Sequence, residues 1–256
     1  MIDLNSLEKL YPENLRPFKR FILREYLQVK ILECIFNSPY SSQLSFLGGT
    51  ALTLVHNNKR FSMDLDFDNF VLSSKDFDDL IEFVVNKLEL IGIRTEARNV
   101  YKGGYRSYLK FPELLYGLGL SPLHDEKILI QIDTTDQPYK YKPEKYLLSK
   151  FDVLTHTNVT PTAILLSQKI CALMERKTTK GRDIYDIIFL FARTQPDFAY
   201  LGKKKGISDL IDLKKKLLVF VKGLDLADLA NDVKPYLFAP EDVSKILLFE
   251  EFIKSL

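Results

Sequence analysis

Apolar residues recur every three or four positions between about Leu15 and Phe36, with charged residues between them. This spacing places the apolar side chains on one face of an amphipathic helix. Polar residues at 37–42 end that helix. A second helix is predicted over 73–92, where Ser74 is the expected N-cap and aspartates enrich the first turns, next to the positive end of the helix dipole.

Runs with strand-like patterning predict short strands between and after these helices. The expected strands are 44–47, about 62–68, a hairpin over 93–111 that turns at Gly103-Gly104, and 127–133. A short helix is expected over about 50–57. From about Thr160 the pattern is helix after helix, so a domain boundary is predicted within 145–160, between a mixed domain (1–150) and a helical domain (151–256).

Two carboxylates share one face of the predicted strand 62–68. Alternate side chains of a strand point the same way, so Ser62, Asp64 and Asp66 face away from the apolar residues between them. Carboxylates two positions apart lie about 6.5–7 Å from each other at the backbone and repel unless a positive charge lies between them. Mg²⁺ prefers such oxygen ligands, together with substrate phosphates. The alternative is a solvent-facing polar strand edge.

Two glycines precede this strand and strengthen the first interpretation. Gly48 and Gly49 follow one strand and open a short helix, where backbone N–H groups can approach a phosphate, and Thr50 adds a hydroxyl donor. A third acid, Asp133, ends the strand 127–133 on its non-core face. If that strand pairs beside 62–68, Asp133 completes a triad of carboxylates; otherwise it is a turn residue at a strand end.

A second group of charged residues lies in two predicted helices over 161–193, joined by a basic loop. Lys169 is on the first of these helices, and Asp183 and Asp186 share one face of the second. If the helices fold back on each other, Asp186 approaches Lys169, which would then meet a nucleotide phosphate as a point charge. The alternative is an ordinary salt bridge, either between the helices or from Arg182 to Asp186.

Composition narrows the class of protein without selecting a function. The chain has 256 residues, is 46% hydrophobic and carries a formal net charge of +2, which neither requires nor excludes a nucleic-acid partner. Cys34 and Cys171 both lie in apolar, helix-like runs and are expected in the core, which suits a reducing compartment. No signal peptide or membrane span is predicted, so we expect a soluble cytoplasmic protein.

The two charged blocks, in this order, resemble the AbiEii/AbiGii toxin family of nucleotidyltransferases, within the DNA polymerase β-like superfamily. The matching segments are GGTALTL with RFSMDLDF, the later strand that ends in Asp133, and KICALMERKTTKGRDIYDI; the resemblance spans roughly residues 20–195. It implies an α+β fold: a polymerase-β-like palm, made of a mixed sheet with flanking helices, followed by a C-terminal helical domain that completes the active-site cleft.

The resemblance also implies roles for individual residues. The superfamily's common Gly-Ser is Gly-Gly-Thr here, and the threonine keeps the hydroxyl. The implied catalytic residues are Asp64, Asp66, Asp133, Lys169 and Asp186, of which Asp64, Asp66 and Asp133 would be metal ligands. The implied nucleotide-binding residues are Gly48, Gly49, Thr50, Ser62, Lys169, Arg182 and Asp183.

The implied reaction is Mg²⁺-dependent transfer of a nucleotide from an NTP to an RNA acceptor, with the tRNA 3′ end as the first choice, by a toxin that has a cognate antitoxin. Basic residues interleaved with tyrosines on the hairpin are candidate RNA contacts, although an exposed basic face is an equal alternative. These candidates are Arg98, Lys102, Arg106 and Lys110. Two other functions stay open: nucleotidyl transfer to a protein hydroxyl or a small molecule, and a non-catalytic nucleotide-binding module.

Overall fold

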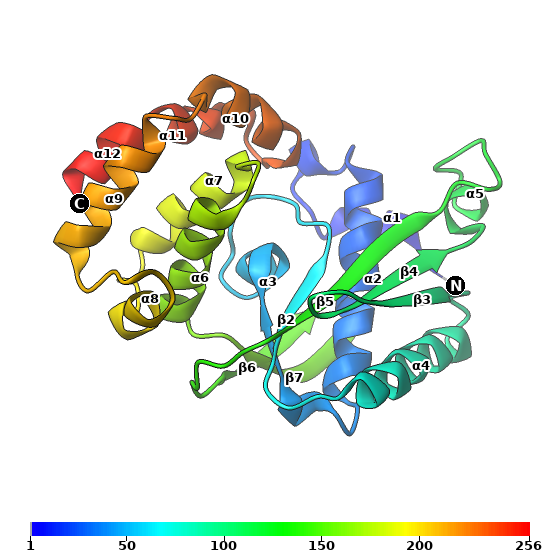
Figure 1. Cartoon of the computed structure of the whole chain (residues 1–256). Coiled ribbons are helices and arrows are strands. Elements are labelled where there is room, and N and C mark those ends of the chain that lie inside the picture. The colour runs from blue at the N-terminus through cyan, green and yellow to red at the C-terminus, as the bar shows by residue number, and fades with distance from the viewer. Residues whose placement is uncertain (1) are drawn as a thin grey trace. The chain divides into compact units, whose positions relative to one another are not determined.

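The computed structural model describes residues 2–256, which fold as two compact units (Figure 1). The first unit comprises the chain as far as His56 and then Ser62–Val159. The second comprises Thr160–Leu256 together with a short segment from earlier in the chain, Asn57–Phe61. The chain therefore leaves the first unit for five residues, directly before the two aspartates Asp64 and Asp66.

A mixed sheet forms the centre of the first unit. Within residues 2–256 it has seven strands in the order β3-β4-β5-β2-β1-β7-β6. The pairs β2–β5 and β1–β7 are parallel, and the other neighbours are antiparallel. The strands are β1 (Leu44–Leu47), β2 (Leu65–Asn69), β3 (Glu96–Tyr101), β4 (Tyr105–Phe111), β5 (Ile128–Asp136), β6 (Glu144–Lys150) and β7 (Val153–Val159).

Helices flank this sheet, which confirms the predicted α+β fold. The long helices α2 (Lys19–Phe36) and α4 (Ser74–Leu90) lie next to each other along the sheet (Figure 1). Their apolar residues form one core with inward-facing strand residues such as Leu65, Phe67 and Ile132. The shorter helices of this unit are α1 (Leu4–Lys9), α3 (Gly48–Leu54) and α5 (Leu114–Gly117), with 3₁₀ turns at Glu13–Leu15 and Ser41–Gln43.

The N-cap of helix α4 lies one residue before the predicted one. Ser73, not Ser74, is the N-cap, because its hydroxyl accepts a hydrogen bond from the backbone of Asp76. The carboxylate of Asp76 in turn accepts a hydrogen bond from the backbone N–H of Ser73, at 3.1 Å. This reciprocal capping box requires a spacing of three residues between cap and acid, which Ser74 does not have.

Strands β6 and β7 were not predicted from the sequence, and they extend the sheet past residue 150. Apolar residues lie on both faces of these strands, because Leu148 and Val153 are buried while Leu147 and Leu154 are exposed, and two threonines, Thr155 and Thr157, are buried as well. The hydrophobic pattern therefore does not mark which face points inward. The predicted strand 62–68 is also shorter in the structure, since β2 begins at Leu65.

The second unit consists of helices and the segment 57–61. Its helices are α6 (Thr162–Glu175), α7 (Gly181–Phe191), α8 (Phe198–Lys205), α9 (Leu210–Val221), α10 (Leu226–Val233), α11 (Ser244–Leu247) and α12 (Phe249–Ser255), with 3₁₀ turns at Lys234–Tyr236 and Pro240–Val243. Within the described residues, none of the helices in either unit is both long and apolar enough to cross a membrane.

The segment 57–61 is held in the second unit by backbone and ring contacts. The backbone N–H of Phe61 donates to the carbonyl of Tyr236 at 2.8 Å, and that of Phe238 donates to the carbonyl of Lys59 at 3.1 Å. The Phe61 and Phe238 rings meet edge to face, with 4.8 Å between their centroids. These contacts fix the segment as a short antiparallel bridge, at Arg60 and Leu237.

Candidate active site

The sheet of the first unit brings two of the predicted acids together. Asp66 on β2 and Asp133 on β5 are direct register partners on neighbouring parallel strands. Their side chains lie on the same face, opposite the buried Leu65 and Phe67. The alternation of 65–67 is as predicted, and the pairing of β2 with β5 meets the condition on which the role of Asp133 depended. Asp64 lies just before β2, in the partly buried stretch that leads into the strand.

The glycine turn lies directly against one of these acids. Gly48 has a positive φ of 79°, and a Cβ at this position would overlap the Oδ2 atom of Asp66. Only glycine allows both the backbone conformation and this close approach. Residues that are 18 positions apart in the sequence therefore meet, and the turn that opens α3 forms one wall of the carboxylate site.

Thr50 has a different role from the predicted phosphate contact. The residue is 1% exposed, and its hydroxyl donates to the backbone carbonyl of Asp64 at 2.5 Å. The single hydroxyl proton is therefore used within the protein. Gln28 on α2, for which no role was predicted, donates an amide N–H to the carbonyl of Ser62 at 3.1 Å. Together the two side chains fix the stretch 62–64 and hence the position of Asp64.

Asp133 is already engaged by a cation. Arg106 on β4 donates to its carboxylate with Nε at 2.5 Å and Nη2 at 3.4 Å, and Gln131 donates to it at 2.5 Å. The ion pair raises the pKa of Arg106 further above its usual value, mainly through its hydrogen bond to Asp133. Arg106, which was predicted to contact RNA, therefore has a partner within the site.

The carboxylates fit a magnesium ion that shares its ligands with a substrate. No group of three acids, histidines or cysteines among residues 2–256 is arranged to hold a metal by itself. Mg²⁺ usually takes only one or two protein carboxylates and completes its shell with phosphate and water oxygens. Asp66 presents its carboxylate beside the glycine turn, where a phosphate could share an ion, and Asp64 stands two residues before it.

The hairpin of β3 and β4 separates its basic residues from two of its tyrosines. By register and alternation, Arg98, Arg106, Lys110 and Tyr108 lie on the face that carries Asp133. Tyr101 and Tyr105 lie on the other face: the hydroxyl of Tyr101 donates to Asp78 of α4, and the ring of Tyr105 packs on Phe77 at 5.6 Å. Lys102 is exposed in the turn. Only Tyr108 therefore combines with the basic residues as predicted.

In the second unit, Asp186 binds the predicted lysine. Lys169 Nζ lies 2.8 Å from Asp186 Oδ2 and 3.6 Å from Asp183 Oδ1, so α6 and α7 do fold back on each other. Arg176 Nη1 lies 2.9 Å from Asp183 Oδ2. Both aspartates are fully buried, and they hold Lys169 from one side of α7. Arg182 lies on the same helix and is partly exposed.

The strongest partner of Asp186 is a residue to which the sequence assigned no role. Arg60, in the segment 57–61, donates to Asp186 with Nε at 2.7 Å and Nη2 at 2.6 Å, and Asn58 adds a hydrogen bond at 2.9 Å. Burial alone would raise the pKa of Asp186, but the charges of Arg60 and Lys169 overcome it and lower the pKa to about 2. Asp186 is therefore a buried anion with three partners.

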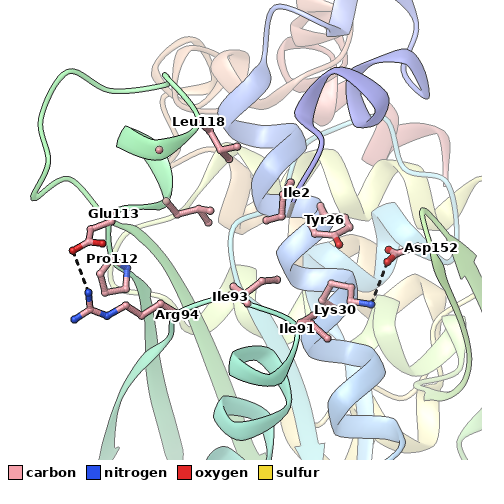
Figure 2. Close-up of a pocket in the computed structure, with 13 residues that line it drawn as sticks. Ile2, Tyr26, Lys30, Ile91, Ile93, Arg94, Pro112, Glu113, Leu118 and Asp152 are labelled. Atoms are coloured by element: carbon pink, nitrogen blue, oxygen red, sulfur yellow. Dashed lines mark hydrogen bonds and ion pairs between the residues drawn. The ribbon is translucent and has the colours of Figure 1, made fainter.

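The first unit also contains a cavity of about 520 Å³ that is separate from these acids (Figure 2). Its wall includes Tyr26 of α2, Ile93 and Leu118, with two ion pairs at its rim. These are Lys30–Asp152, at 3.4 Å, and Arg94–Glu113, at 3.1 Å (Figure 2). Since none of the predicted site residues lines it, this cavity is not the candidate active site.

Comparison with known proteins agrees with the resemblance seen in the sequence. The model of the family described as "Nucleotidyl transferase AbiEii toxin, Type IV TA system" matches residues 30–222. No curated protein matches the sequence significantly. Two similar structures are JHP933 from Helicobacter pylori (TM-score 0.54, 18% identity, covering 92% of each chain) and MenT4, a nucleotidyltransferase toxin from Mycobacterium tuberculosis (TM-score 0.59, 14% identity, covering 100% of this chain and 91% of that one). At these identities the two structures support the fold alone.

Proposed function

The chain belongs to the AbiEii family of nucleotidyltransferase toxins of type IV toxin–antitoxin systems, and we propose that it transfers a nucleotide from an NTP to the 3′ end of an RNA, with tRNA as the preferred acceptor and Mg²⁺ as cofactor. The observation that carries this proposal is the contact between the Gly48 turn and the carboxylate of Asp66. It puts a phosphate-binding backbone turn beside a metal-binding acid, which is the combination that nucleotidyl transfer requires.

The chain's own residues would bind and orient the reactants. Asp64 and Asp66 would hold Mg²⁺, which when bound neutralises the triphosphate and polarises the α-phosphate. The N–H groups of the Gly48-Gly49 turn would receive the phosphates. The hydroxyl oxygen of the acceptor would form a bond to the α-phosphorus as the bond to pyrophosphate breaks, and Asp133 would take the hydroxyl proton. Catalysis would then rest mainly on positioning and charge stabilisation.

Lys169 is assigned to a nucleotide phosphate from the family pattern, with Arg182 as a second cation. The support for Lys169 is its anchoring: Asp183 and Asp186 both bind its ammonium group, and its side chain keeps 13% exposure. A lysine held in this way acts as a placed point charge. We infer that Asp183 and Asp186 position Lys169 and do not themselves touch the nucleotide.

The acceptor is assigned from the chemistry of the sheet face. Arg98 and Lys110 flank Tyr108 on the face that carries Asp133, and both basic side chains are exposed. Cations can hold a nucleic-acid backbone while an aromatic ring stacks on a base, which is how single-stranded RNA is commonly bound. Since NTP and tRNA are the proposed substrates and an antitoxin is the proposed partner, we expect the protein to act in the cytoplasm.

A direct transfer assay tests the proposal. Purified protein is incubated with Mg²⁺ and each α-labelled NTP, with either total tRNA or lysate protein as acceptor. We expect label in the tRNA for the wild type and for Asp125→Asn, an exposed aspartate in the turn before β5, and none for Asp64→Asn or Asp66→Asn. Label that appears only in protein bands contradicts the RNA acceptor, and activity that survives both site variants contradicts the assigned site.

A further inference from the structure

Arg106 lies next to Asp133 on the face of the sheet that carries the acids. Strand register places Asp66 of β2 opposite Asp133 of β5, and Asp133 opposite Arg106 of β4. The three side chains therefore lie in one row across three adjacent strands, about 4.8 Å apart at the backbone. A cation thus borders the pair of carboxylates on the side toward Arg98, Tyr108 and Lys110.

The ion pair between Arg106 and Asp133 is bidentate. Two guanidinium nitrogens donate to the two carboxylate oxygens, and Gln131 donates to one of them as well. These three hydrogen bonds use lone pairs that a metal ion would need. The Asp133 side chain keeps 22% exposure and that of Arg106 keeps 46%, so the pair is open to solvent and to a ligand on one side.

We propose that Arg106 is a positioning residue that keeps Asp133 from binding a divalent ion until the phosphate backbone of the RNA acceptor draws the guanidinium away. The inference rests on the proposed function and adds the order in which the acceptor binds and Asp133 becomes free. In the resting site, metal binding depends on Asp64 and Asp66 alone. Acceptor binding moves the hydrogen bonds of Arg106 from Asp133 to an acceptor phosphate, and the freed carboxylate can then share a second ion or take the hydroxyl proton.

The charges explain why such an arrangement would be useful. With Arg106 withdrawn and no acceptor bound, the neighbouring carboxylates of Asp66 and Asp133 would repel each other and would attract a second metal ion prematurely. With Arg106 in place, the site stays short of its last ligand until a substrate with the right charge arrives.

Binding of Mn²⁺ tests this inference without using activity. Mn²⁺ is titrated by electron paramagnetic resonance in the presence of each unreactive α,β-methylene NTP, which supplies the triphosphate. We expect the wild type to bind one ion tightly and a second weakly. Arg106→Met should tighten the second ion by about tenfold, the usual effect of one neighbouring charge, and Arg106→Met combined with Asp133→Asn should return it to the wild-type value. A short RNA with a free 3′ hydroxyl should tighten the second ion in the wild type but not in Arg106→Met.

Two controls separate the possible failures. Lys145→Met removes an exposed lysine from β6, at the other end of the strand order from β4, and it should leave both ions unchanged. Asp66→Asn should abolish the first, tight ion; if that ion persists, the proposed function fails at its metal site. If the first ion behaves as expected but Arg106→Met leaves the second unchanged or weaker, the role of Arg106 is wrong and the proposed function stands.

Discussion

Replacing Asp186 by asparagine removes one charge from a fully buried cluster and keeps the shape of the side chain. Asp186 accepts two hydrogen bonds from Arg60, one from Asn58 and an ion pair from Lys169. The variant leaves Arg60, which is almost fully buried, and Lys169, which is 13% exposed, facing a neutral amide. We expect Asp186→Asn to destabilise the protein strongly, although the residue lies in a region that also serves the proposed reaction.

Two arguments give a similar size for this effect. The pKa of Asp186 falls from 3.8 to about 2 in the folded protein, and a shift of this size corresponds to roughly 2–3 kcal/mol between the charged and neutral forms. Breaking a buried ion pair by removing one partner typically costs about 3–5 kcal/mol. We therefore predict a loss of about 3 kcal/mol, or about 6–12 °C in Tm for a protein of this size.

Urea denaturation followed by far-ultraviolet circular dichroism measures the change, and calorimetry shows whether both units unfold together. Lys254→Gln is the control, because Lys254 lies 2.7 Å from Glu250 in an exposed pair whose loss should cost below about 0.5 kcal/mol. A cycle with Arg60→Met should give a coupling of about 1 kcal/mol or more between Arg60 and Asp186. If Asp186→Asn is no more destabilising than Lys254→Gln, the buried cluster does not stabilise the fold and our reasoning fails.

Three further predictions follow from the same structure. The difference in the free energy of unfolding between wild type and Asp186→Asn should be complete above pH 4 and should shrink as the pH falls toward 2. The reason is that a carboxyl whose pKa is lowered in the folded state stabilises the protein only where it is ionised. A difference that stays constant over this range in pH-dependent urea melts argues against Asp186 as a buried anion. Gly48→Ala should abolish transfer and lower the free energy of unfolding in urea melts by more than about 2 kcal/mol, since the new Cβ would overlap Asp66. Gly92 has the same φ of 79° but open space around it, so Gly92→Ala should cost only about 1 kcal/mol and stay active. Equal effects of the two variants would contradict the contact between Gly48 and Asp66. Burial raises the pKa of Cys34 to about 11, so its thiol should react with a disulfide reagent at pH 8 at least about tenfold more slowly than in the unfolded chain, and a full-speed reaction would refute its burial.

The sequence is sufficient to predict the parts of the site that depend on local periodicity. Alternation in 62–68 assigns Leu65 and Phe67 to the core and Asp66 to the opposite face, as the structure shows. Helical spacing likewise predicts that Asp183 and Asp186 share one face of their helix, and both contact Lys169. In both cases neighbouring residues on one element share a face, so the pattern itself carries the geometry.

Other parts depend on contacts that no local pattern records. Arg60 stands four residues before Asp64, yet it is buried with Asp186 in the other unit, and only the tertiary fold decides this. The strands β6 and β7 are missed because threonines are buried and leucines exposed. Arg106 looks like a nucleic-acid contact in the sequence because its partner, Asp133, is 27 residues away. The burial of Arg60 could not be predicted, because the residues that surround it come from distant parts of the chain.

Sequencing of tRNA 3′ ends from cells that express the protein tests the central claim most directly. We predict that wild-type expression arrests growth and adds one or more nucleotides to the 3′ ends of one or more tRNAs. Asp64→Asn, produced at the same level, should leave growth and the tRNA ends unchanged, while Asp125→Asn should act like the wild type. Growth arrest with unaltered tRNA ends, or altered ends in the Asp64→Asn strain, would contradict the account.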